Sequence, residues 1–113
     1  MSIEYRDLIE WADTIHTERA PDFIDKWLAL QEDPSQAVDQ LALFLARSFV
    51  EGAVSFDIAN TIFNQTMPVI GFDEAPPTFW QFYAAFEDYE HLDSPAVQAH
   101  QRIKSELSAI NEI

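Results

Sequence analysis

Residues 79–93 read FWQFYAAFEDYEHLD, and this stretch contains six aromatic and four acidic side chains but neither lysine nor arginine. Successive residues of an α-helix lie about 100° apart around its axis. On that helical wheel four of the aromatic rings fall within one narrow sector: Phe79, Phe82, Tyr83 and Phe86. The stretch therefore predicts a helix with an apolar stripe that packs into the core of the protein.

Trp80 lies outside this stripe, on a flank of the predicted helix that it shares with Ala84, Glu87 and His91. Asp88 points away from the core on the same wheel. An aromatic side chain surrounded by charged ones is typical of a protein-binding surface. The alternative is that Trp80 packs against a neighbouring helix, because large rings are rarely left exposed.

Apolar residues recur at helical spacing in five further segments, which predicts a helix in each. These apolar positions are Leu8, Trp11, Ala12 and Ile15; Phe23, Trp27, Leu28 and Leu30; Val38, Leu41, Ala42, Leu45 and Phe49; Phe56, Ala59, Ile62 and Phe63; and Val97, Ile103, Leu107 and Ile110. No segment of useful length alternates between apolar and polar residues as a half-buried strand does. We therefore expect an all-α fold, a compact antiparallel bundle of five or six helices in a single domain over residues 1–113.

Local signals predict where these helices begin and end. Ser35, Ser55 and Thr78 are the expected N-caps, because their hydroxyl groups accept hydrogen bonds from the first turn of a helix. Gly52 stands where a residue of left-handed conformation would end a helix. Pro68 is expected to end the helix that precedes it, since proline removes a backbone donor.

The chain is strongly acidic, with 20 Asp and Glu residues against six Lys and Arg and a formal net charge of −14. No Lys or Arg occurs between Arg47 and Arg102, and we expect the acids in this span to remain unneutralised. Such a charge repels nucleic acids and anionic membranes and attracts basic proteins. Nucleic-acid binding is also disfavoured because phosphate contacts need clustered Lys and Arg. The alternative is that the acidic surface serves only solubility.

Composition also limits the chemistry. The chain has no Cys and only two Gly, which excludes disulfides, a cysteine nucleophile and a glycine-rich phosphate loop. The N-terminal MSIEYRDLIEW lacks the basic flank and apolar run of a signal peptide, and no apolar stretch approaches the length of a membrane span. We expect a cytoplasmic protein without a cofactor and without membrane contact, and no particular oligomeric state is indicated.

Two D-x-x-H pairs, Asp13 with His16 and Asp88 with His91, lie on different predicted helices. A carboxylate and an imidazole three residues apart on a helix can bind one metal, and di-iron bundles use two such pairs. Those bundles use Glu rather than Asp and add two inward Glu residues, for which no apolar helix of this chain offers a candidate. We therefore do not expect an enzyme, and the alternative is a metal-binding helical enzyme that uses His16 and His91 with nearby carboxylates.

Residues 41–93 contain three features in a distinctive order. A predicted helix ends in FVEGAVS at residues 49–55, which is an F-x-x-G-x-(I/V)-S step. A helix with the spaced rings Phe56 and Phe63 follows, and after an irregular acidic loop comes the aromatic, acidic helix of residues 79–90. This order resembles the colicin D-type immunity family, small helical proteins of bacterial toxin systems.

The resemblance implies a protein that inhibits a cognate toxin stoichiometrically, often a nuclease that cleaves RNA or DNA. Nucleases are basic where they hold phosphate, so the acidity of this chain favours a basic toxin as partner independently. The resemblance supplies no shared catalytic residue, and only acidic and aromatic positions are candidates for contact with the toxin. These are Asp73, Glu74, Trp80, Glu87, Asp88 and His91, with Asp57 and Glu51 as secondary candidates. A phage-type acidic inhibitor of a host nuclease is a further alternative.

Overall fold

The structure is a computed structural model, and it describes residues 3–13, 23–71, 73–90 and 95–110. Six helices form over these residues, and no strand occurs among them. The helices are α1 (Tyr5–Asp13), α2 (Phe23–Ala29), α3 (Pro34–Val50), α4 (Phe56–Ile70), α5 (Pro77–Glu87) and α6 (Pro95–Ala109). The predicted all-α fold is confirmed.

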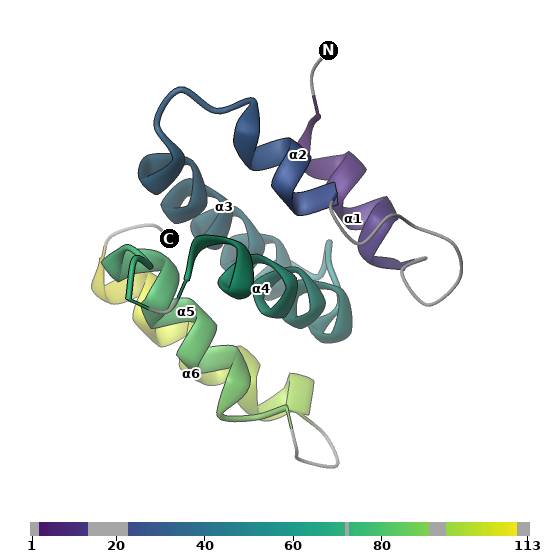
Figure 1. The fold of residues 1–113 in the computed structure, drawn as a ribbon. Coiled ribbons are helices and arrows are strands. Elements are labelled where there is room, and N and C mark those ends of the chain that lie inside the picture. The colour runs from purple at the N-terminus through teal and green to yellow at the C-terminus, as the bar shows by residue number, and fades with distance from the viewer. Residues whose placement is uncertain (1–2, 14–22, 72, 91–94, 111–113) are drawn as a thin grey trace.

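The helices form three antiparallel pairs, with α3 and α4 between the α1–α2 pair on one side and the α5–α6 pair on the other (Figure 1). Helix α3 packs against α2, α4, α5 and α6, and α4 packs against α1, α2, α3 and α5. The Cα radius of gyration is 13.4 Å, close to the value of about 13 Å for a compact domain of 100 residues. The expected compact bundle is therefore present.

The centre of the core is a cluster of phenylalanine rings from α3, α4 and α5. Phe86 is fully buried, and its ring centroid lies 5.3 Å from Phe49, 5.3 Å from Phe56 and 5.1 Å from Phe63. Phe79 lies 5.3 Å from Phe63 and is equally buried. These separations are typical of aromatic pairs that contribute packing energy beyond their buried area. The predicted apolar stripe of residues 79–93 is the side of α5 that faces this cluster.

The N-terminus of α5 is capped by a residue of another helix. Thr78 was the expected N-cap, and that prediction is wrong because the helix begins at Pro77 after an extended Pro76. A residue before proline favours extended backbone, and proline suits the first helical position because it has no N–H to satisfy. Asp39 of α3 accepts a hydrogen bond of 2.7 Å from the Phe79 amide instead. This contact joins the start of α5 to α3.

The ends of α3 and the start of α4 follow local signals, with one correction. Asp33, rather than the predicted Ser35, caps α3 by accepting a hydrogen bond from the Gln36 amide, because Pro34 occupies the first helical position. Ser55 caps α4 as predicted by accepting from the Ile58 amide. Gly52 has a φ of 83°, the left-handed conformation expected after a helix.

Pro68 does not end α4, which continues to Ile70 and stops at Gly71. The prediction failed because Pro68 lies in the last turn, where a missing donor removes only one hydrogen bond near the helix end. The backbone around it keeps its contacts, since the Thr66 hydroxyl donates to the Ile62 carbonyl at 2.6 Å and the Gly71 amide donates to the Met67 carbonyl at 2.8 Å. Helix α4 therefore extends two residues beyond Pro68, where the sequence predicted its end.

Three predicted apolar positions lie on the surface. Val97 is 76% exposed, and Leu30 and Ile110 are exposed as well. The buried side of α6 consists of Ala99, Ile103 and Leu107, spaced four residues apart. Val97 falls on another side of that helix, and Ile15 lies outside the described residues.

We predict that Phe86→Ala lowers the free energy of unfolding by about 3–5 kcal/mol, because it leaves a cavity between three other rings. Phe86→Leu, which conserves most of the volume, should cost less. Urea unfolding followed by circular dichroism measures both. Leu30→Ala is the control, since Leu30 is 46% exposed and should change stability by about 0.5 kcal/mol or less. Equal effects of Phe86→Ala and Leu30→Ala would contradict this account of the core.

We predict that Asp39→Ala lowers the free energy of unfolding by about 1 kcal/mol, because the Phe79 amide loses its acceptor at the helix N-terminus. Asp39→Asn should cost less, since it keeps an oxygen acceptor and removes only the charge. Gln40→Ala at the exposed neighbouring position is the matched control and should be almost neutral. The cap assignment is wrong if Asp39→Ala is no more destabilising than Gln40→Ala in the same urea experiment.

Candidate protein-binding surface

Helix α5 has an exposed side between α4 and α6. Trp80 is 45% exposed and Glu87 is exposed, as the helical wheel predicts for the flank that they share. The Trp80 ring stacks on Tyr83, with centroids 5.5 Å apart and planes inclined by 11°. Trp80 is therefore held in place on its inner side by Tyr83 and presents much of its ring to solvent.

Tyr83 connects the aromatic and the acidic parts of this side of α5. Its ring is buried, and its hydroxyl group donates a hydrogen bond to the carboxylate of Glu87. The pKa of Tyr83 is raised to about 12, first by burial and then by the hydrogen bond to Glu87 and the negative charges of Glu87 and Glu90. The hydroxyl group is protonated at neutral pH, as in any tyrosine, and is a donor for the Glu87 carboxylate.

Two side-chain amides of α4 bind the carboxylate of Glu90, which lies close to Tyr83 and Glu87. Asn60 Nδ2 donates to Glu90 Oε2 at 2.9 Å, and Asn64 Nδ2 lies 3.4 Å from the same oxygen. Asp57 is exposed in the first turn of α4, at a spacing that places it on the same side of the helix as Asn60. We call the surface formed by Asp57, Trp80, Tyr83, Glu87 and Glu90 the α4–α5 face.

Asp88 has a different environment, which corrects the expectation that the acids of residues 79–93 are all unneutralised. The guanidinium of Arg102 on α6 forms an ion pair with Asp88, and Arg102 Nε lies 3.2 Å from Glu106 Oε2. Glu106 also accepts a hydrogen bond of 3.1 Å from Gln81 of α5. Hydrogen bonding to Asp88 raises the pKa of Arg102, opposed by burial and helped by the charge of Glu106. This network fastens α6 to α5, so Asp88 serves the fold.

Glu87 and Glu90 form no ion pair with Lys or Arg in the part of the chain that the structure describes. Glu87 is the last residue of α5, whose final turn contains no basic residue. A carboxylate at a helix C-terminus lies at the negative end of the helix dipole, which is unfavourable for the isolated chain. Its negative charge there brings the fold no electrostatic gain, and its orientation by Tyr83 leaves it available to a cation.

The predicted site residues do not form one cluster. Glu51 follows α3 at the end of the bundle where α4 begins, and it is exposed close in sequence to Asp57. Asp73 and Glu74 are exposed in the connection before α5, at the opposite end of that helix from Glu87. Glu74 lines a separate pocket with residues of α2 and α3. His91 lies outside the described residues.

The sequence did not predict four residues of the α4–α5 face and its support. They are Tyr83, Glu90 and the two asparagines, Asn60 and Asn64, that bind Glu90. The helical wheel assigned Tyr83 to the core, and it does pack there, while its hydroxyl group reaches the surface carboxylate. Glu90 lies on the core side of the wheel at the helix end, which is the one sequence signal for its contact with α4. The asparagines have no local signal, because their partner is 26 and 30 residues away in the sequence.

The metal-binding alternative depends on His16 and His91, which both lie outside the residues that the structure describes. Within the described ranges, no three or more His, Asp or Glu side chains gather in a way that could hold a metal ion. Of the carboxylates in the two D-x-x-H pairs, Asp13 is exposed at the end of α1 and Asp88 is bound by Arg102. The described part of the structure therefore gives this alternative no support.

None of the helices described is both long enough and apolar enough to span a membrane. Comparison with known proteins yields no match to a family model, a curated protein or a solved structure. The chemistry of this chain and the resemblance in residues 41–93 are therefore the observations that indicate its function.

We predict that Tyr83 ionises near pH 12, about two units above its ordinary value of 10.0. Because folding raises this pKa, the environment of Tyr83 stabilises the fold fully below pH 10 and loses that contribution as the pH rises through about 12. An ultraviolet titration of tyrosinate absorbance measures the step. Tyr83→Phe should abolish it, and Glu87→Gln should move it toward pH 10; an unchanged step in Glu87→Gln would contradict the contact between the two side chains.

Proposed function

We propose that this chain is a cytoplasmic immunity protein that binds and neutralises a cognate basic toxin domain, a nuclease, without catalysing a reaction. Three features support the proposal: the net charge of −14, the resemblance in residues 41–93, and the α4–α5 face. Each is consistent with a basic protein partner, and the third suggests where that partner binds.

The observation that supports the proposal most directly is the pairing of Trp80 with Glu87. Binding energy at protein interfaces is concentrated in a few side chains, with Trp among the most frequent. Trp80 is exposed yet oriented by stacking on Tyr83, and the same Tyr83 orients the Glu87 carboxylate. A surface ordered before binding loses less conformational entropy when the partner arrives.

Inhibition would follow from occupation of the site where the nuclease holds phosphate. Arg and Lys side chains of that site would pair with Glu87, Glu90 and Asp57 and so be unavailable to nucleic acid. The overall negative charge would also steer the basic partner, and complementary charges raise association rates to about 10⁸–10⁹ M⁻¹s⁻¹ at low salt. Protection would need only binding, and this chain would catalyse no reaction.

A phage-type inhibitor of a host nuclease would use the same chemistry, and the two proposals differ in the source of the partner. An immunity gene normally lies directly after its toxin gene, so gene neighbourhood separates them. We favour immunity because the order of features in residues 41–93 resembles that family.

Co-expression with the product of the adjacent upstream reading frame tests the proposal. If that product arrests growth, the wild-type chain should restore growth and should bind the product with one-to-one stoichiometry. Trp80→Ala and Glu87→Lys should each weaken binding and raise the dissociation constant by about 30-fold or more, as expected for residues at the centre of an interface. Both positions are exposed, so circular dichroism and urea unfolding should show an intact fold.

Asp13→Lys is the matched control, because it makes the same charge change at an exposed position on α1. It should change affinity by less than about threefold, the range expected for an exposed charge outside the α4–α5 face. Asp88→Lys is a poor probe, since it would break the ion pair with Arg102. If Glu87→Lys and Asp13→Lys weaken binding equally, the α4–α5 face is not the contact. If the upstream product does not bind the wild-type chain, immunity is refuted.

A further inference from the structure

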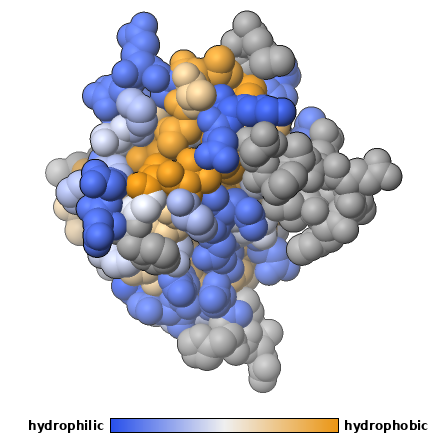
Figure 2. Space-filling model, in the orientation of Figure 1, coloured by the Kyte–Doolittle hydropathy of each residue, from blue (hydrophilic) through white to orange (hydrophobic). Residues whose placement is uncertain are grey.

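A pocket of about 180 Å³ opens on another part of the surface, where α2, α3 and the end of α4 meet. Its residues come from four separate segments of the chain. They are Leu28, Pro34, Ser35, Val38, Ile70, Glu74 and Pro76. Figure 2 shows an apolar patch over α2 and the end of α4, with hydrophilic surface to its left and below it.

The pocket has the size and chemistry to take one apolar side chain. Val38 is fully buried at its base, and Leu28 and Ile70 are half-buried. An apolar cavity of about 150 Å³ in a protein core accommodates benzene, whereas pockets for drug-sized ligands measure about 300–1,000 Å³. A single aromatic or branched aliphatic side chain therefore fits better than a free metabolite.

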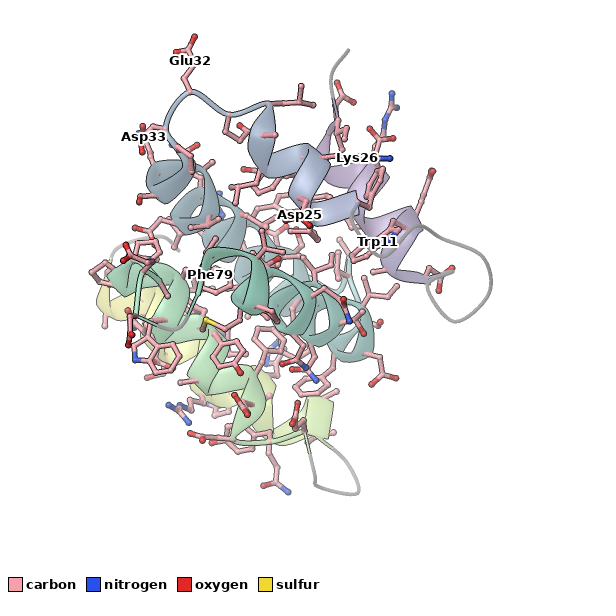
Figure 3. The ribbon with its side chains drawn as sticks, in the orientation of Figure 1. Trp11, Asp25, Lys26, Glu32, Asp33 and Phe79 are labelled. Atoms are coloured by element: carbon pink, nitrogen blue, oxygen red, sulfur yellow. The ribbon has the colours of Figure 1, made fainter. Side chains whose placement is uncertain are left out.

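One carboxylate lines the pocket, and two more lie next to its lining residues in the sequence or one helical turn away. Glu74 lines it directly, and Asp33 caps α3 beside Pro34. Asp25 is exposed one helical turn before Leu28, whereas Lys26 extends toward α1 (Figure 3). An apolar side chain that enters the pocket is thus met by negative charge on its flanks.

We infer that this pocket binds one apolar, preferably aromatic, side chain of a basic protein segment whose neighbouring Lys or Arg residues pair with Glu74, Asp25 and Asp33. A second copy of this chain is the wrong occupant, because a twofold contact would bring the two acidic rims together. Two molecules of net charge −14 would also repel each other. The inference rests on the proposed function only in assigning the segment to the toxin.

This pocket and the α4–α5 face lie within reach of one partner. Figure 2 shows both regions on the same side of the molecule, with the hydrophilic surface over α4 and α5 below the apolar patch. The 11 residues of α5 span about 16 Å at 1.5 Å per residue. A typical interface covers about 800 Å² on each partner, roughly 30 Å across. One toxin domain can therefore insert an apolar side chain here and place basic side chains on the α4–α5 face.

The test uses short synthetic peptides and does not require the toxin. The probe is acetyl-Lys-Lys-Phe-Lys-Lys-amide, and the matched control replaces Phe by Ser at constant charge. Two-dimensional NMR of the isotope-labelled protein should show the Phe peptide shifting the amides of Leu28, Val38 and Ile70. The Ser peptide should bind at least about tenfold more weakly, because burial of an aromatic side chain is lost.

Two variants extend the test to the protein. Ser35→Trp at the exposed rim should fill the pocket and abolish the difference between the two peptides, and Glu74→Lys should weaken the Phe peptide more than Glu51→Lys does. Equal binding of the Phe and Ser peptides, or shifts spread evenly over the acidic surface, would refute the pocket while leaving the α4–α5 face untouched. If the wild-type chain gives no protection in the co-expression assay but still binds the Phe peptide more tightly than the Ser peptide, the proposed function is refuted and the pocket is not.

Discussion

The burial of Phe86 between rings from α3 and α4 is the contact on which the rest of the structure depends. Because successive helical residues lie at fixed angles, placing Phe86 in the core also sets the direction of every other side chain of α5. That rotation directs Trp80 and Glu87 to solvent and turns Gln81 and Asp88 toward α6. The remote cap from Asp39 holds the other end of α5 against α3. The candidate binding surface is therefore a consequence of how the core is packed.

The acidic residues near the end of α5 differ in whether their contacts are with a basic residue or with uncharged donors. Arg102 binds Asp88 at the end of α5 and Glu106 of α6 in a network that joins the two helices. Glu87 and Glu90 are ordered instead by uncharged donors, a tyrosine hydroxyl and two asparagine amides. Neutral donors orient a carboxylate without cancelling its charge, so these two acids retain their attraction for a cationic partner. Asp88 and Glu106 therefore stabilise the bundle, whereas Glu87 and Glu90 are candidates for contact with a partner.

The sequence predicted the features that depend on neighbours along the chain. Helical periodicity identified the core side of α5, and the Ser55 cap and the left-handed Gly52 are decided within a few residues. It failed where two local signals competed, as when Pro34 moved the α3 cap from Ser35 to Asp33. It also failed at Pro68, because proline weakens a helix less in its last turn than in its middle.

What the sequence by itself determined is therefore the helical class, the core side of α1, α3, α4 and α5, and the excess of negative charge. Only the tertiary structure decided which acids are neutralised, because Asp88 and Arg102 are 14 residues apart and meet through the packing of α5 on α6. The cap of α5 likewise comes from a residue 40 positions earlier. The apolar pocket needs α2, α3 and α4 to be assembled before it exists. Helix periodicity is local, whereas a surface is made from side chains that only the folded chain brings together.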